Sequence, residues 1–299
     1  MSLPAAQRQV LNPFDMQSPL QNILSQITRR MPRFPGLGRC VIAADSFCGR
    51  SDAADGSTLL ASVNDGCLIK VDGRVLEQKF AFYYGEWEHE LIGASLRHYS
   101  GGAFYDIGGS IGLYAVAVGR HCRTHGGFVR TFEPFPANLQ RLRDNLELNG
   151  LTECDVKIHP IALNNAAGTL RVALVADGLP GNAKVVQNGG TEVLVRTLDD
   201  VWTEAGREPV GFIKIDTEGY DGQVLLGAAE LLKECRPAML VEFNRERMTN
   251  LGFSFPQIWG LLIRDLSYRA FEIDGRGRAI QVTDPGHKEN LLFLSDANG

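Results

Sequence analysis

The sequence lacks the features by which membrane, secreted and nucleic-acid-binding proteins are usually recognised. No run approaches the roughly 20 apolar residues of a membrane span, and the N-terminus has no basic region followed by an apolar one. The six cysteines are scattered without a C-x-x-C pair, which indicates reduced thiols and no disulfide framework. A net charge of −5 provides no general attraction for phosphate backbones or anionic lipids. We therefore expect a cytoplasmic protein with no nucleic acid or membrane partner.

The composition is that of a globular protein with a full hydrophobic core. The chain has 299 residues, 44% of them hydrophobic, enough for one large domain with an appendage. From Ala103 onward strand-like and helix-like segments alternate, which predicts a doubly wound α/β fold with a parallel, seven-stranded sheet. The predicted strands are Ala103–Ile107, Phe128–Phe132, Val156–Leu163, Gly211–Ile215, Ala238–Phe243, Tyr268–Ile273 and Asn290–Leu294. The predicted helices are Glu86–Tyr99, Pro136–Leu148, Gly219–Leu232 and Phe255–Leu266.

The N-terminal part of the sequence is less regular. Residues 1–50 show no sustained periodicity and contain many turn-forming Pro and Gly residues. Two short apolar runs between Thr58 and Val75 flank an Asn-Asp-Gly turn and predict a small hairpin. We therefore divide the chain into an N-terminal extension, residues 1–78, and a main domain, residues 79–299. The extension is a candidate cap or dimerisation element of a homodimer, and the Gly-rich insertion at residues 177–191 is a candidate flap near the site.

A glycine-rich turn follows the first strand of the main domain. An apolar strand ends at an acid, turns through glycines and enters a helix of small residues. Glycines let the main chain approach a ligand closely, and the free N–H groups of the helix start attract a carboxylate. The turn therefore predicts a cofactor cradle; the alternative is a tight turn that Asp106 merely caps. The predicted cradle residues are Asp106, Gly108, Gly109, Ser110 and Gly112.

A second acid follows the next strand. Glu133 lies 21 residues after Gly112, and in a doubly wound fold the ends of adjacent strands meet at the ligand crevice. A carboxylate at this position accepts hydrogen bonds from both hydroxyls of a ribose. The alternative is a carboxylate that only stabilises the start of the following helix.

The glycine turn and Glu133 fit either a dinucleotide enzyme or a methyltransferase. A dinucleotide fingerprint requires a glycine where this chain has Ser110, and the anion of Asp106 would repel a pyrophosphate. The same carboxylate attracts the cationic amine and sulfonium of S-adenosylmethionine. These details favour S-adenosylmethionine as the cofactor.

Several ordered motifs together resemble the FkbM family of methyltransferases over about residues 82–293. The resemblance implies a Rossmann-like class I fold, mostly parallel with an antiparallel last strand. It also implies S-adenosylmethionine as donor and an oxygen acceptor on a sugar, glycan or natural product, with Ala162 and Leu163 along the adenine. One departure is Gly109-Ser110, where the family commonly has Ala-Asn. The motifs are Asp106-x-Gly108-x-x-x-Gly112, Phe132-Glu133-Pro134 with Asn138, Asn145 and Asn149, Ala162-Leu163 with Gly168, Lys214-Ile215-Asp216-x-Glu218-Gly219, and Val241-Glu242.

Three carboxylates are the candidate catalytic residues. Asp216 and Glu218 follow the fourth strand and are candidates for acceptor orientation or proton removal, with Glu242 behind them at the end of the next strand. We assign no metal, although converging carboxylates are also the ligands of a divalent cation. The main alternative is that Asp216 or Thr217 caps the following helix.

The sequence therefore predicts an O-methyltransferase acting on a hydroxyl of a small molecule or carbohydrate. The Asp-Pro-Pro-aromatic type of motif used on exocyclic base nitrogens is replaced here by Asp216-Thr217-Glu218-Gly219. The remaining alternatives are an NAD(P)-dependent oxidoreductase and a non-catalytic module that binds the cofactor. His89 and His159 are further candidate bases, and Lys214 shares a strand face with Asp216 as a candidate ion-pair partner.

Overall fold

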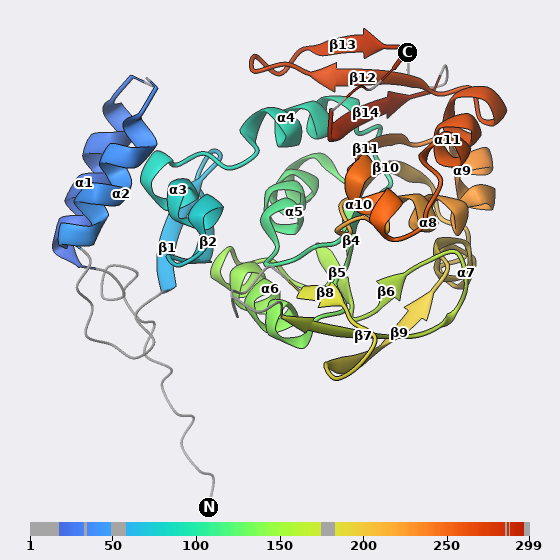
Figure 1. Cartoon of the computed structure of the whole chain (residues 1–299), viewed down its shortest axis with the longest axis horizontal. Helices are drawn as coiled ribbons and strands as arrows, with labels where there is room; N and C mark the ends of the chain where they lie inside the picture. Colours follow the sequence, from blue (N-terminus) through green and yellow to red (C-terminus); the bar gives the residue numbers. More distant parts are fainter. Residues whose placement is uncertain are drawn as a thin grey trace, which may run out of the picture. The chain divides into compact units, whose positions relative to one another are not determined.

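The computed structural model describes residues 18–32, 35–48, 58–174, 183–284, 286 and 288–295. The chain divides into two compact units, Met1–Trp87 and Glu88–Gly299 (Figure 1). In the described part of the chain, no helix combines the length and the apolar character needed to cross a membrane.

The described residues of the first unit form three helices and a hairpin. The predicted hairpin is confirmed: its two strands pair antiparallel through the three-residue turn Asn64-Asp65-Gly66, in which all three residues have positive φ. The two helices before it were not predicted. Helix α1 begins with a capping box between Ser18 and Gln21 and with Pro19 in its first turn, a start signal that is local and readable. The elements are α1 (Pro19–Arg30), α2 (Leu37–Cys48), β1 (Thr58–Val63), β2 (Cys67–Asp72) and α3 (Leu76–Tyr84).

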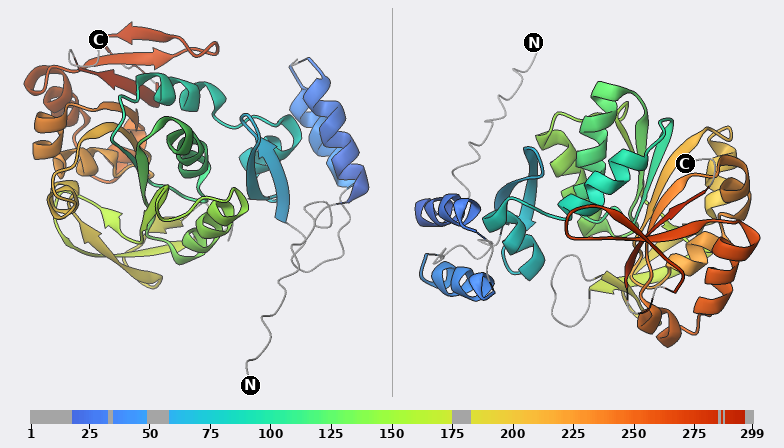
Figure 2. Two further views of the ribbon diagram at one scale, coloured as in Figure 1. Left: turned by 180° about the vertical axis from the view of Figure 1, so that it is seen from behind. Right: turned by 90° about the horizontal axis from the view of Figure 1, so that it is seen from above.

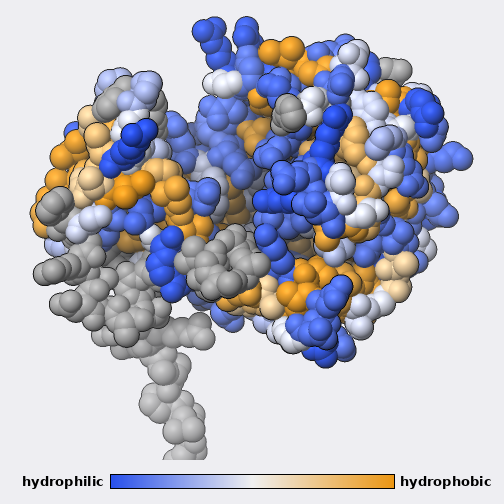
Figure 3. All heavy atoms as spheres, in the orientation of Figure 1, coloured by the Kyte–Doolittle hydropathy of each residue, from blue (hydrophilic) through white to orange (hydrophobic). Residues whose placement is uncertain are grey.

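Polar contacts attach helix α1 to the rest of its unit. The Gln21 side chain donates to the Asp45 carboxylate at 3.0 Å, and Arg29 donates to backbone carbonyls of Ser62 and Phe82 at 2.8 Å each. Three of its apolar side chains and that of its C-cap residue are exposed instead, and apolar surface is visible over α1 and α2 in Figure 3. The exposed apolar residues are Leu20, Ile23, Ile27 and Met31.

The second unit is built on an eight-stranded sheet, in the order β13-β12-β14-β11-β10-β3-β4-β5. The strands from β11 to β5 run parallel, whereas β14 runs antiparallel to both β11 and β12. The predicted doubly wound α/β class is therefore confirmed. The strands are β3 (Ala103–Ile107), β4 (Phe128–Phe132), β5 (Val156–His159), β10 (Val210–Ile215), β11 (Ala238–Glu242), β12 (Arg269–Ile273), β13 (Ala279–Val282) and β14 (Asn290–Leu294).

The strand count differs from the predicted seven. β13 adds an edge strand antiparallel to β12; it has only four residues, most of them exposed, and gives little strand signal. The predicted strand Val156–Leu163 is also divided: β5 ends at His159, and β6 (Ala162–Leu163) pairs with a strand of another sheet. Pro160 lies at the division, where a residue without an N–H group interrupts a ladder.

Helices cover both faces of the large sheet (Figures 1 and 2). On one face the core is formed by apolar side chains of β3, β10, β11 and β14 against α7, α8, α9 and α11. The start of helix α6, with Pro136 at its first position, agrees with the prediction. The helices are α4 (His89–His98), α5 (Leu113–His125), α6 (Pro136–Leu148), α7 (Leu198–Glu204), α8 (Asp221–Leu226), α9 (Ala229–Cys235), α10 (Arg245–Asn250), α11 (Phe255–Gly260) and the π-helical turn η2 (Leu261–Asp265).

A small four-stranded sheet, in the order β6-β9-β7-β8, contains the predicted insertion. Its other strands are β7 (Gly168–Leu174), β8 (Ala183–Val185) and β9 (Thr191–Arg196). The predicted flap falls partly on residues 175–182, which lie outside the described residues. The described remainder joins β8 to β9 and places Lys184 and Val185 beside the site discussed below.

Candidate active site

A cavity of about 410 Å³ lies at the carboxyl ends of β3, β4 and β10. This is the position at which doubly wound sheets bind ligands. Seven of the predicted site residues line it, whereas Asp106, Gly109, Gly112 and Glu242 do not. Its walls also include Leu170 and Val172 of the small sheet. The seven predicted residues are Gly108, Ser110, Glu133, Ala162, Leu163, Asp216 and Glu218.

The glycine turn is packed too closely to admit side chains. Gly108 has φ +79°, and a Cβ atom there would lie 1.8 Å from the backbone oxygen of Asp216. A Cβ at Gly109 would lie 2.1 Å from Thr131 Oγ1. Ser110 also has a positive φ of 47°, a conformation that costs a non-glycine residue energy and that concentrates at functional sites. The turn thus brings the ends of β3, β4 and β10 together and lets the backbone form the cavity floor.

Gly108→Ala is expected to be less stable than the matched variant Gly126→Ala by about 1–3 kcal/mol, the usual cost of overpacking. Both glycines have positive φ, at +79° and +87°, but nothing lies within 4 Å of a Cβ at Gly126. The left-handed conformation penalises both variants alike, so their difference measures the contact with Asp216. Urea unfolding of both proteins gives this difference, and equal stabilities would show that the close approach is absent.

Glu133 lies at the end of β4 with both carboxylate oxygens engaged. It accepts hydrogen bonds from the backbone N–H groups of Ser110 at 2.9 Å and Phe135 at 2.8 Å. The side chain is buried, and this desolvation raises its pKa to about 7 although the two N–H groups act in the opposite direction. Nearby, the buried amide oxygen Oδ1 of the cavity residue Asn138 has no hydrogen-bond partner. Free acceptor capacity at both residues suits a ligand that carries hydroxyl groups.

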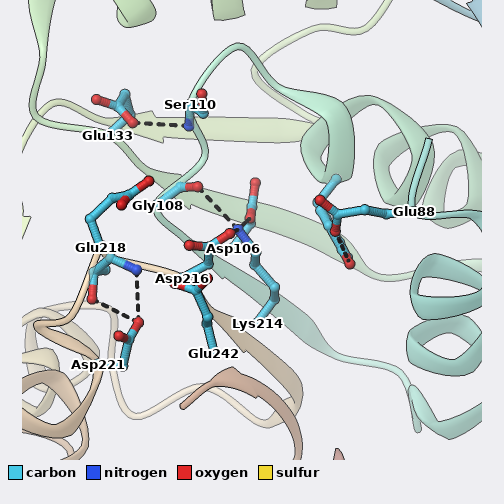
Figure 4. Close-up of polar contacts among 12 residues, drawn as sticks. Glu88, Asp106, Gly108, Ser110, Glu133, Lys214, Asp216, Glu218, Asp221 and Glu242 are labelled. Carbon is cyan, nitrogen blue, oxygen red and sulfur yellow. Dashed lines mark hydrogen bonds and ion pairs between the residues drawn. The ribbon is translucent and has the colours of Figure 1, made fainter. Parts of the chain in front are cut away.

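Lys214 is a buried cation between the carboxylates of two strands (Figure 4). Its Nζ donates to the carbonyl of Gly108 at 3.1 Å and lies 3.4 Å from Asp216 and 3.9 Å from Asp106. Burial alone lowers the pKa of Lys214, but the carboxylates of Asp216, Asp106 and Glu88 outweigh it and raise the pKa. Lys214 therefore joins the glycine turn to both acids.

Asp106 is fully buried beneath this turn. Its Oδ2 accepts a hydrogen bond from Thr131 at 3.0 Å, whereas its Oδ1 has no hydrogen-bond partner. Burial raises the pKa of Asp106, and Lys214 acts in the opposite direction. The sequence argument treated Asp106 as an anion facing the ligand, but the structure places it behind the cavity wall with Lys214 as counter-ion.

The turn from Asp216 to Tyr220 presents the candidate catalytic acids. Helix α8 starts at Asp221, and its N-cap residue Tyr220 makes no side-chain cap. Instead Asp221 accepts hydrogen bonds from the N–H groups of Thr217 at 2.7 Å and Gly219 at 3.2 Å. The alternative that Asp216 or Thr217 caps this helix is therefore wrong, and the Asp216 side chain, 38% exposed, is available to the cavity.

Arg247 connects the other two acids, a role that the sequence analysis missed. Its Nη1 lies 2.6 Å from the Glu218 carboxylate and 3.4 Å from Glu242. Burial, together with Asp216 and Asp221, raises the pKa of Glu242, while Arg247 acts in the opposite direction. Burial also raises the pKa of Glu218, while Arg247 lowers it. The signal for Arg247 is weak because it lies on α10, beyond the strand that carries Glu242.

The other candidates lie outside the cavity lining. His159 stacks on the Phe132 ring, and burial and Arg130 lower its pKa to about 4. His89 begins helix α4 and is exposed. Among the residues that the structure describes, no group of three or more His, Cys, Asp or Glu is arranged to hold a metal ion.

The lining has two chemically different parts on either side of Gly108. Ile161, Ala162, Leu163 and Phe135 form an apolar part next to Glu133, which suits a flat heteroaromatic ring attached to a ribose. Asp216, Glu218 and Arg247 form a charged part on the β10 side. The residues present therefore fit an adenosyl cofactor, with the polar reaction partner on the side of the acids.

Comparisons with known proteins agree with this geometry. The sequence profile described as the methyltransferase FkbM domain matches residues 106–270, more than half of the chain. A comparison with curated protein sequences gave no match.

Similar solved structures include a methyltransferase FkbM from Methylobacillus flagellatus, with 21% identity and a TM-score of 0.43. That alignment covers 65% of this chain and 44% of the other, so this chain spans less than half of that protein. An O-methyltransferase from Bacillus cereus in complex with SAH has 14% identity and a TM-score of 0.39, covering 93% and 97% of the two chains. A SAM-dependent O-methyltransferase from Thermotoga maritima has 13% identity and a TM-score of 0.37, covering 69% and 63%.

These structural similarities are too distant to support a functional argument, so the family assignment depends on the sequence profile. On that match, the chain belongs to the FkbM family of S-adenosylmethionine-dependent methyltransferases.

Proposed function

We propose that this protein transfers the methyl group of S-adenosylmethionine to a hydroxyl group of a sugar, glycan or small natural product. The observation that carries the proposal is the two-part cavity, with Glu133 beside an apolar wall and the pair Asp216 and Glu218 across Gly108. The family supplies the cofactor, and the arrangement of acids supports an oxygen acceptor.

The apolar part of the cavity holds the nucleoside. Glu133 accepts hydrogen bonds from the ribose hydroxyls, and Ala162 and Leu163 pack along the adenine. When bound, the cofactor supplies a methyl group on a sulfonium, which is already an activated leaving group. The backbone of the glycine turn positions it, because Gly108 and Ser110 line the cavity without large side chains.

The charged part of the cavity acts on the acceptor. Asp216 accepts the hydroxyl proton or orients the hydroxyl towards the methyl group, and Glu218 is held beside it by Arg247. Glu242, whose pKa is raised by burial and by Asp216, lies 3.4 Å from Arg247 at the edge of this cluster. Lys184 and Val185 of the insertion border the same cavity and are proposed to contact the acceptor.

Ligand binding and methyl transfer test this function directly. Thermal-shift measurements are expected to show stabilisation by S-adenosylhomocysteine and none by NAD or NADP. Incubation with radiolabelled S-adenosylmethionine and a panel of hydroxylated acceptors, including sugars and phenols, then identifies the acceptor class by transfer of label. Stabilisation by NAD or NADP alone would favour the oxidoreductase alternative. If wild type and Asp216→Asn both bind the cofactor and neither transfers the methyl group, a non-catalytic module is favoured.

The affinity for S-adenosylhomocysteine is expected to fall with pH below about 7. Ribose hydroxyls donate to the ionised form of Glu133, whose pKa is about 7 in the free protein. Affinity is therefore constant well above pH 7 and decreases by up to about tenfold for each pH unit below it. Calorimetric titrations between pH 5.5 and 8.5 measure this slope. Glu133→Gln is expected to abolish it, and an unchanged slope in that variant would assign the dependence to another group.

A further inference from the structure

Glu88 does not line the cavity, but it lies close to Lys214 and Asp216 (Figure 4), and neither the motifs nor the proposed reaction gives it a role. It immediately precedes helix α4 and has φ +48°, the left-handed conformation that non-glycine residues seldom adopt. Its carboxylate accepts a hydrogen bond from the hydroxyl of buried Tyr114 at 2.9 Å. Glu88 is exposed as a residue, and desolvation of its carboxyl group raises its pKa. A strained residue that points a carboxylate inward fits a binding role.

The carboxylates around Lys214 outnumber the cations. Glu88, Asp106 and Asp216 all interact electrostatically with Lys214, whose ammonium also lies 5.1 Å from the centre of the Tyr114 ring. Figure 4 shows Glu88 and Asp216 on either side of the Lys214 side chain. Three carboxyl groups share one ammonium group, and burial raises the pKa of Glu88 and Asp106, so a further cation would stabilise their charged forms. The cluster is therefore suited to a second cation, supplied by a ligand.

The topology indicates which part of the ligand reaches this cluster. Strand β3, which leads into Gly108, lies between β4 and β10. Glu133 follows β4, and Asp216 follows β10. A donor whose ribose binds Glu133 and whose sulfur lies over the glycine turn extends its amino-acid portion towards the β10 side. That portion carries an α-ammonium group.

We infer that Glu88, together with Asp216, binds the α-ammonium group of the methyl donor. This assignment rests on the proposed function and adds a donor-binding residue outside the family motifs. Tyr114 is a positioning residue because its hydroxyl fixes the carboxylate of Glu88. Lys214 contacts the same cluster, at 3.4 Å from Asp216 and 3.9 Å from Asp106.

Two ligands that differ only in the amino-acid portion test the inference by calorimetric titration of the full chain. S-adenosylhomocysteine contains the α-ammonium group, whereas 5′-methylthioadenosine keeps the adenosine and the sulfur without it. Glu88→Gln is expected to weaken S-adenosylhomocysteine by about tenfold or more and to change methylthioadenosine by less than about twofold. Tyr114→Phe is expected to weaken S-adenosylhomocysteine by a smaller factor and to leave methylthioadenosine unchanged.

Glu90→Gln, an exposed neighbour on α4, is the matched control and is expected to bind both ligands as wild type does. Equal weakening of both ligands by Glu88→Gln would mean a general disturbance of the site and would overturn the inference. Unchanged affinity for both would overturn it as well. If the wild-type protein binds neither ligand, the proposed function itself fails, an outcome distinct from the other two.

Discussion

Lys214→Met is expected to lower the free energy of unfolding by about 3–5 kcal/mol at pH 8, the usual cost of removing one partner of a buried charge pair. The variant keeps most of the side-chain volume but leaves Asp106, which is fully buried, without its counter-ion. The loss is expected to shrink as the pH falls, because protonation of Asp106 then removes the uncompensated charge. Urea unfolding followed by circular dichroism measures both quantities.

Two further variants separate the charge from the packing. Lys233→Met changes an exposed lysine of α9 and is expected to alter stability by less than about 0.5 kcal/mol. Adding Asp106→Asn to Lys214→Met removes the orphaned charge and is expected to recover part of the lost stability. A Lys214→Met protein as stable as wild type would show that Asp106 is neutral in the native state at pH 8.

Local patterns carried much of the fold and part of the site. The alternation of apolar strands with helices predicted β3, β4, β10, β11 and β14 closely, because each strand is short, buried and followed by a turn signal. The glycine turn and Glu133 were predictable for a related reason. Adjacent parallel strands end at the same edge, so residues that follow them converge whatever the details of packing.

Contacts between distant segments were not predictable in this way. Arg247 meets Glu218 from a helix that begins three residues after β11 ends, and nothing local indicates that its side chain turns back towards the site. The burial of Asp106 behind Lys214 is also invisible in the sequence, where the acid reads as a ligand-facing group. The prediction placed Ala162–Leu163 in the large sheet, whereas β6 pairs with β9 of the small sheet. The pairing partner of a strand is set by the whole topology and not by strand propensity, so the sequence does not indicate it.

The three candidate acids, Asp216, Glu218 and Glu242, lie in different environments, and this difference distinguishes their roles. The side chain of Glu242 is 15% exposed and does not line the cavity, and burial together with Asp216 raises its pKa. Glu218 lies 2.6 Å from Arg247, so the guanidinium group already balances its negative charge. Asp216 borders the cavity, contacts Lys214 at 3.4 Å and remains more exposed than Glu242. Of the three, Asp216 is therefore the best placed to meet an acceptor hydroxyl.

Asp216→Asn is expected to lower kcat by about 10²–10⁴-fold on the acceptor that the labelling experiment identifies, the usual contribution of a positioned acid or base. The amide cannot take up the hydroxyl proton, although it retains the shape of the carboxylate. If Asp216 removes the proton, the acid limb of the pH–rate profile disappears in the variant. If it only orients the hydroxyl, the limb remains and KM rises.

Asp265→Asn, an exposed change in η2, is the matched control and is expected to turn over as wild type does. Affinity for methylthioadenosine provides the second control. This ligand lacks the α-ammonium group and is titrated without the acceptor, so nothing in that measurement is expected to contact Asp216. An unchanged methylthioadenosine affinity with a large loss of kcat locates the effect in the transfer step. A kcat within about threefold of wild type, well below the contribution expected of an acid or base, would instead move the catalytic role to Glu218 and make Asp216 a donor-binding residue alone.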